Sequence, residues 1–131
     1  GEFGTITGSP RRTGWFDSVI VRHAVRVNGL DCLVINKLDT LSGLKTLKVC
    51  TAYKLPDGTV IKDYPAALEE FAKCEPVYEE FEGFNEDISG CKSFDELPEV
   101  CKKYIARLEE LCDCHIGMVG VGPDRSQQLM R

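Results

Sequence analysis

Apolar and polar positions alternate along the chain in patterns that predict strands and helices in turn. The run 32–35 is apolar throughout, as expected of a strand covered on both faces. Pro56-Asp57-Gly58 between two alternating stretches predicts a β-hairpin. The expected strands lie at 32–35, 45–55, 59–62, 77–81 and 115–119. The expected helices lie at 15–28, 68–73 and 96–112, with a loop at 83–94.

The first expected helix, 15–28, ends at Gly29 and carries Phe16, Ile20, His23 and Val27 on one face. Because His23 falls on an apolar stripe and no nucleophile motif accompanies it, we expect a packed, hydrogen-bonded histidine rather than a catalytic one.

The helix at 96–112 has the clearest periodicity. Pro98 must fall in its first turn, which makes Asp95 a better N-cap than Ser93. We expect it to pack on the sheet beside the strand from His115. Its apolar face consists of Leu97, Val100, Cys101, Tyr104, Ile105, Leu108 and Leu111.

The order of elements favours an α/β fold, a mixed sheet with packing helices and a hairpin near 45–62. No internal repeat or low-complexity linker interrupts it, so 1–131 is expected to form a single unit.

Polar residues follow the apolar strand 32–35 directly. Ligands of open α/β sheets lie beyond the carboxyl ends of strands, where Asn36, Lys37 and Asp39 emerge. A carboxylate such as Asp39 accepts from the paired N1 and 2-amino donors of guanine, which adenine lacks. The aliphatic stem of Lys37 can lie along a purine face. Taken alone, the pattern Asn-Lys-x-Asp at 36–39 also fits an ordinary solvated turn.

A second loop follows the expected strand 115–119. Glycines at Gly120 and Gly122 let the backbone approach a planar ligand closely. Gly122-Pro123-Asp124 is also a common turn signal, so a plain turn remains an alternative for this piece.

A third cluster, at 4–14, is bounded by glycines and carries hydroxyls and two arginines, Arg11 and Arg12. This composition suits an anion-binding loop. It is not a Walker loop, because no Gly-Lys-Ser/Thr follows. The alternative is that both arginines are surface charges near a chain end.

Together the motifs resemble the carboxyl-terminal part of adenylosuccinate synthetase, and they occur in the same order over the whole chain. They are Gly-x-x-Thr-Gly-x-Pro-Arg-Arg-x-Gly-Trp-Phe-Asp at 4–17, Val27-Asn28-Gly29, Lys37-Leu38-Asp39, Lys48-Val49-Cys50, Pro76-Val77-Tyr78-Glu79 and Gly122-Pro123-Asp124-Arg125.

The resemblance implies a ligase of purine nucleotide biosynthesis with a P-loop-NTPase-like fold, which uses GTP to join L-aspartate to IMP with the help of Mg²⁺. The family's phosphate loop and catalytic aspartate and histidine lie upstream of the matched motifs. We therefore expect residues 1–131 to be a carboxyl-terminal segment without catalytic or metal-binding residues, inactive alone. The resemblance also implies a homodimer.

The resemblance assigns site residues one by one. Those expected to bind GTP are Arg11, Lys37, Leu38, Asp39, Gly120, Val121 and Gly122. Those expected to form the aspartate and IMP loop are Thr5, Ile6, Thr7, Gly8, Ser9, Pro10 and Arg11.

The loop departs from the family pattern, because the usual Thr-Thr-Gly-Arg reads Ile6-Thr7-Gly8-Ser9 here. One hydroxyl and one carboxylate-binding arginine are lost. Either a neighbour compensates, Arg12 being the nearest candidate, or the loop has drifted. This puts aspartate and IMP binding in doubt, while guanine binding is unaffected.

Composition narrows the function classes. A net charge of −5 and scattered positive residues argue against nucleic acid. The acidic run Glu79, Glu80, Glu82 and Glu86 is read as a solvated surface. No apolar stretch approaches a membrane span and no signal peptide opens the chain, so cytoplasm is the expected location.

The seven cysteines are read as reduced thiols. Cys112, Cys114 and His115 lack the second ligand pair of a structural zinc site.

Two alternatives to the synthetase interpretation remain. The segment is either a module that only binds guanine nucleotide, or a piece that only packs against another domain.

Overall fold

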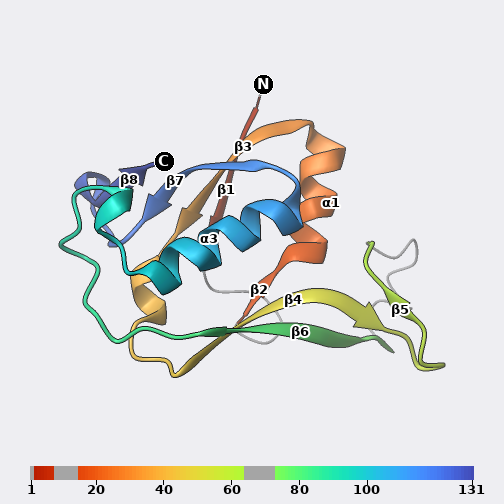
Figure 1. The fold of residues 1–131 in the computed structure, drawn as a ribbon. Coiled ribbons are helices and arrows are strands. Elements are labelled where there is room, and N and C mark those ends of the chain that lie inside the picture. Colours follow the sequence, from red (N-terminus) through yellow and green to blue (C-terminus); the bar gives the residue numbers. More distant parts are fainter. Residues whose placement is uncertain (1, 8–14, 64–72) are drawn as a thin grey trace.

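A computed structural model describes residues 2–7, 15–63 and 73–131 of the chain (Figure 1). The elements of the first half are β1 (Glu2–Thr7), β2 (Phe16–Asp17), α1 (Ser18–Asn28), β3 (Leu30–Asn36), the 3-10 helix η1 (Leu38–Leu41), β4 (Thr46–Lys54) and β5 (Val60–Ile61). Those of the second half are β6 (Glu75–Glu82), η2 (Phe94–Glu96), α3 (Glu99–Cys112), β7 (His115–Gly120), η3 (Arg125–Gln127) and β8 (Gln128–Met130).

The strands divide into two sheets. The first has the order β1-β3-β7-β8, in which β1, β3 and β7 are parallel and β8 is antiparallel to β7. In the second sheet β4 pairs with β2, β5 and β6. The expected hairpin is confirmed, since Tyr53 and Lys54 of β4 pair antiparallel with Ile61 and Val60.

The helices lie between the two sheets (Figure 1). Helix α1 contacts β3 and β4, α3 contacts β6 and β7, and the helices contact each other. One core cluster therefore draws on every layer, with Leu33 from β3, Val49 from β4 and Leu108 from α3 all buried. The expected α/β class with packing helices is confirmed, and so is the packing of the last helix beside the strand from His115.

The predicted apolar face of the first helix was wrong. The helix begins only at Ser18, because the Asp17 carboxylate accepts hydrogen bonds from the amides of Val19 and Ile20, at 3.0 and 3.1 Å. Its buried side then carries Ser18, Val19 and Val25, while Val27 is 67% exposed. Phe16 lies in β2, and His23 is exposed rather than packed. The expected end at Gly29 is confirmed by its left-handed φ of 62°.

Helix α3 begins three residues later than predicted, at Glu99. Proline disfavours helical angles in the residue before it, and Leu97 accordingly adopts ψ 149°. Asp95 is therefore not the N-cap of this helix and lies in the separate 3-10 helix η2. The buried positions Cys101, Tyr104 and Leu108 agree with the predicted face.

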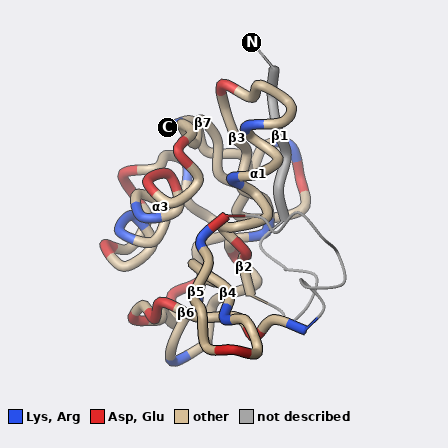
Figure 2. Tube along the Cα trace, turned by 90° about the vertical axis from the view of Figure 1, so that its right-hand side faces the viewer, with Lys and Arg blue, Asp and Glu red and all other residues tan. Residues whose placement is uncertain are grey.

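Charged residues of both signs are spread over the trace, with a concentration of carboxylates along β6 (Figure 2). Glu80, Glu82 and Glu86 are exposed, as expected of a solvated surface. Glu79 is different, because it accepts two hydrogen bonds from Arg107 of α3, at 2.8 and 2.9 Å. Of the expected helix 68–73, only residue 73 is described. In the described residues no helix combines the length and apolar character that crossing a membrane requires.

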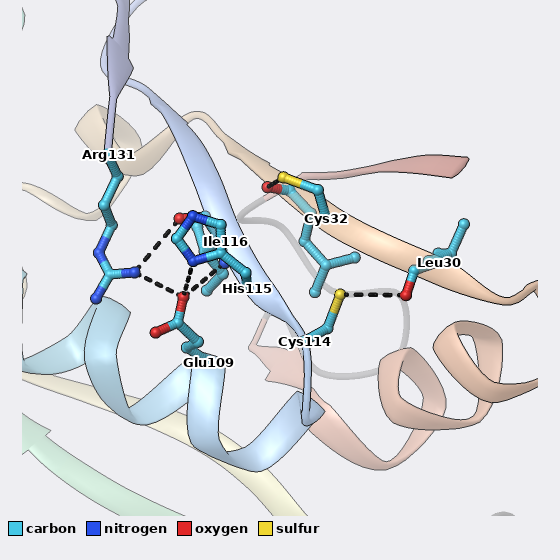
Figure 3. A network of polar contacts seen from close by, with 8 residues as sticks. Leu30, Cys32, Glu109, Cys114, His115, Ile116 and Arg131 are labelled. Atoms are coloured by element: carbon cyan, nitrogen blue, oxygen red, sulfur yellow. Dashed lines mark hydrogen bonds and ion pairs between the residues drawn. The ribbon is translucent and has the colours of Figure 1, made fainter. Parts of the chain in front are cut away.

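Glu109 of α3 joins the start of β7 to the last residue of the chain (Figure 3). Its Oε2 accepts from the Ile116 amide at 2.7 Å and from Arg131 at 2.6 Å, and lies 2.8 Å from Nδ1 of His115. Burial by itself opposes ionisation of Glu109. The hydrogen bonds from Ile116 and Arg131 outweigh this effect and hold the pKa of the carboxyl below its ordinary value.

This network predicts a pH-dependent stability. The folded pKa of Glu109 is lowered, so its stabilisation is fully present above the ordinary glutamate pKa of about 4.3 and is lost as pH falls through the lowered value. We expect Glu109→Gln to reduce the free energy of unfolding by about 1–2 kcal/mol at neutral pH. Urea unfolding as a function of pH measures this difference, which should shrink in acid.

The control compares two chains that both carry His115→Ala, one with Glu109 and one with Glu109→Gln. Because neither has the imidazole, its contribution to the pH dependence of stability is removed. A stability difference between the parent chain and Glu109→Gln that stays constant from neutral to strongly acidic pH would contradict the role of the ionised carboxylate.

Candidate functional site

The carboxyl ends of three parallel strands meet at one edge of the first sheet. Thr7 at the end of β1 pairs with Asn36 at the end of β3, and Ile35 of β3 pairs with Val119 near the end of β7. The loops that leave these strands therefore begin side by side, at the edge where α/β sheets bind ligands. This register places the start of the segment at 37–39 and the start of the segment at 121–122 at the same edge of the sheet.

The segment after β3 turns sharply at Lys37. This lysine adopts the left-handed conformation, with φ 61° and ψ 35°, which L-residues other than glycine, asparagine and aspartate rarely occupy. The turn is closed by Thr40, whose amide and hydroxyl both donate to the Lys37 carbonyl, at 3.1 and 2.7 Å. Lys37 remains exposed.

Leu38 and Asp39 form the start of η1 and have opposite environments. Leu38 is 1% exposed and belongs to the core, so only its backbone is available to a ligand. Asp39 is half-buried, and its carbonyl accepts from the Ser42 amide at 3.1 Å. The buried leucine thus anchors the turn, while the carboxylate of Asp39 remains partly accessible.

The end of β7 lies against the end of β3. A Cβ built on Gly120 would come within 3.1 Å of Asn36 Oδ1 and 2.9 Å of Gln128 Nε2. The Asn36 side chain therefore reaches the backbone at Gly120, so the end of β3 and the end of β7 are in direct contact. Val121 is fully buried, and its amide donates to the Gln127 carbonyl at 2.8 Å.

The predicted site residues differ in whether their side chains are exposed or buried. Lys37 and Asp39 present polar side chains, whereas Leu38 and Val121 bury theirs. Gly120 is buried and Gly122 is half-buried, and a Cβ at either position would meet a side chain of the protein itself.

Sequence reasoning missed two side chains that lie against the second loop, those of Gln127 and Gln128. Gln127 is the third residue after Asp124 in η3, and its Oε1 accepts from the Asp124 amide at 3.0 Å. This is the reciprocal pattern of a capping box, and the spacing Asp-x-x-Gln was visible in the sequence. Gln128 offered no comparable signal.

The predicted aspartate and IMP loop is described only in part. Thr5, Ile6 and Thr7 lie in β1, paired with Val34, Ile35 and Asn36. Gly8, Ser9, Pro10 and Arg11, and with them Arg12, lie outside the described residues. Thr7 ends β1 at the same edge as Asn36, so this loop also starts at the shared edge.

The residues considered for zinc, Cys112, Cys114 and His115, have different surroundings in the structure. Burial raises the pKa of the Cys112 thiol to about 12, which keeps it protonated. The Cys114 thiol lies 3.6 Å from the Leu30 carbonyl, and His115 contacts Glu109 (Figure 3). Within residues 2–7, 15–63 and 73–131 no three His, Cys, Asp or Glu side chains are grouped to hold a metal ion.

The fold and this edge define an α/β unit of the class that binds ligands beyond the carboxyl ends of its parallel strands. Its sequence identifies it further, because a model of the adenylosuccinate synthetase family matches residues 1–129. The chain belongs to the adenylosuccinate synthetase family.

Two relatives of this chain are both called adenylosuccinate synthetase, and both are much longer than the chain. It is 55% identical to the adenylosuccinate synthetase of Clostridioides difficile strain 630 over 130 residues, which cover 99% of this chain and 30% of that protein. It is 59% identical to that of Bacillus cereus strain ATCC 14579 over 126 residues, covering 96% and 29%. The chain thus spans slightly less than a third of these relatives.

A solved structure gives the same result. Fully ligated adenylosuccinate synthetase from Plasmodium falciparum superimposes with a TM-score of 0.85 and 39% sequence identity, covering 90% of this chain and 28% of that one. The expected fold, that of part of an adenylosuccinate synthetase, is confirmed.

The left-handed turn predicts that Lys37 stores backbone strain. Lys37→Gly should be at least as stable as the parent chain and roughly 1 kcal/mol more stable than Lys37→Ala, because alanine keeps the strained conformation and glycine does not. Urea unfolding of the three chains measures this order. If glycine instead destabilises more than alanine, as its flexibility in the unfolded state would cause, position 37 is not left-handed in solution.

Proposed function

We propose that this chain is the carboxyl-terminal part of an adenylosuccinate synthetase and supplies its guanine-binding site. The enzyme would use GTP to join L-aspartate to IMP, a ligase step of purine nucleotide biosynthesis. Family membership supports the reaction. The single observation that carries the site is the contact between Asn36 and Gly120, because the two loops then start side by side at one sheet edge.

The guanine base is assigned to the space between these loops. The Asp39 carboxylate accepts from the N1 and 2-amino groups, and the stem of Lys37 lies along the ring. The backbone of Leu38, Val121 and the flanking glycines Gly120 and Gly122 closes the other sides. The left-handed turn at Lys37 supports this assignment, since strained backbone is concentrated at binding and catalytic sites.

The aspartate and IMP loop is assigned to 5–11, with Arg11 also near GTP. The pairing of Thr7 with Asn36 supports this placement, because both loops then leave the sheet at one edge. Bidentate arginine contacts suit the carboxylate of aspartate and the phosphate of GTP.

Catalysis and metal binding are assigned to parts of the longer protein. The described residues offer no group of carboxylates that fits Mg²⁺. We expect residues 1–131 alone to be inactive, and the full-length protein to be a cytoplasmic homodimer.

Base identity tests the proposal. In a full-length synthetase carrying this segment, Asp39→Asn should raise the KM for GTP about tenfold or more, because charge-assisted hydrogen bonds worth roughly 1.5–3 kcal/mol are lost. It should also improve use of xanthosine triphosphate, whose 2-carbonyl can accept from the new amide. Steady-state kinetics with both nucleotides gives the preference.

Asp95→Asn is the matched control, since it removes the same charge from an exposed position in η2. Retention of the parent's preference for guanine in the Asp39→Asn enzyme would show that Asp39 does not read the base.

A further inference from the structure

The side chain of Gln127 connects two loops that lie far apart in the sequence. Its Oε1 accepts from the Asp124 amide at 3.0 Å, and its Nε2 donates to the Ser89 carbonyl at 3.2 Å. Its own carbonyl accepts from the Val121 amide at 2.8 Å. One residue thus ties the turn after β7 both to η3 and to the loop at 83–92.

The amide of Gln127 also packs directly on the backbone of Gly122. A Cβ built on Gly122 would lie 2.3 Å from Cδ, Nε2 and Oε1 of Gln127. A side chain at 122 would therefore have to displace this amide and break its two hydrogen bonds. The glycine at this position serves a contact within the protein, in addition to any approach of a ligand.

The loop at 83–92 provides a firm support for Gln127. Phe84 and Ile88 are 3% and 1% exposed and belong to the main core. Next to Ile88, the amide and hydroxyl of Ser89 both donate to Asp87 Oδ1, at 3.0 and 2.6 Å. The carbonyl to which Gln127 donates is therefore held in place by core packing and a local turn.

The other end of the same loop is attached to the segment that carries Asp39. Ser42 Oγ donates to the Glu86 carbonyl at 2.9 Å, and the Gly43 amide donates to the Phe84 carbonyl at 2.8 Å. Ser42 in turn donates its amide to the Asp39 carbonyl. The loop at 83–92 consequently contacts both segments of the proposed guanine site.

We propose that Gln127 is a positioning residue for the nucleotide. It holds the Gly120–Gly122 turn against the loop at 83–92, and through that loop sets the distance between the turn and Asp39. This inference rests on the proposed guanine site. It adds to that proposal the side chain that fixes the position of the Gly120–Gly122 turn relative to Asp39. Gln127 acts through the backbone it fixes and is not assigned a contact with the base.

Removing the side chain should affect one substrate selectively. In the full-length synthetase, Gln127→Ala should raise the KM for GTP about five- to tenfold, as expected when two hydrogen bonds that hold the turn are lost. The KM for IMP should stay within twofold. A purely structural role would instead lower the amount of active enzyme and reduce kcat without this selectivity.

Gln127→Glu separates the two contacts. Its carboxylate can still accept from the Asp124 amide but places an oxygen against the Ser89 carbonyl. We expect a KM for GTP raised as in the alanine variant. The matched control is Ser126→Ala, an exposed neighbour in η3, which should leave all three substrate KM values unchanged. If Gln127→Glu has the parent's KM for GTP, the link to Ser89 does not position the turn and the inference fails.

A double-mutant cycle with Gly122→Ala tests the packing contact. The added methyl group must displace the Gln127 amide, so each single substitution should raise the KM for GTP. The double variant should be little worse than either one, since both remove the same interaction. Effects that multiply independently would overturn the coupling between Gly122 and Gln127.

Hydrogen exchange distinguishes this inference from the proposed function. The Val121 amide should exchange faster in Gln127→Ala than in the parent, whatever the enzyme's substrates are. Unchanged exchange overturns the positioning role, and so does faster exchange with an unaltered KM for GTP. A parent enzyme that shows no GTP-dependent activity would instead contradict the proposed function.

Discussion

The parallel pairing of β3 with β1 and β7 is the constraint on which the rest of the site depends. Side chains alternate between faces along a strand, so a slip by one residue would move every side chain of β3 to the opposite face of the sheet. Leu33 and Ile35 lie in the main core. Their burial fixes the register, and the register places Asn36 beside Gly120. Core packing close to the end of β3 therefore determines which residues meet at the edge of the sheet.

The loops at this edge are held by buried side chains at their centres. Leu38 lies between Lys37 and Asp39, and Val121 lies between two glycines; both are essentially inaccessible to solvent. Each anchor fixes the backbone on either side of it. Such an arrangement accounts for a lysine in the left-handed region, because strained backbone persists only where its surroundings determine it. The polar groups of the site are thus positioned mainly by apolar contacts.

Sequence patterns predicted those parts of the fold in which local and tertiary preferences agree. The apolar run of β3, the hairpin at Pro56-Asp57-Gly58 and the strand from His115 were all found. The face of α1 was wrong because its residues are apolar on more than one side, and contacts with β4 and α3 decide which side is buried. The start of α3 was misplaced because the restriction that Pro98 imposes on Leu97 outweighed helical periodicity.

The residues of the candidate site also differ in whether sequence patterns indicate them. Lys37, Asp39 and the glycines of the second loop were proposed from the sequence because their residue types suit a purine and they follow strands. The spacing of Gln127 from Asp124 is visible in the sequence as a capping box, but its contact with Ser89 depends on how a distant loop packs. With Leu38 and Val121 buried, few polar side chains of the matched motifs at 36–39 and 120–122 can face a base. In the proposed site, selectivity rests on the distance between Asp39 and a turn of backbone, so the residues proposed to set this distance would matter as much as those that contact a ligand.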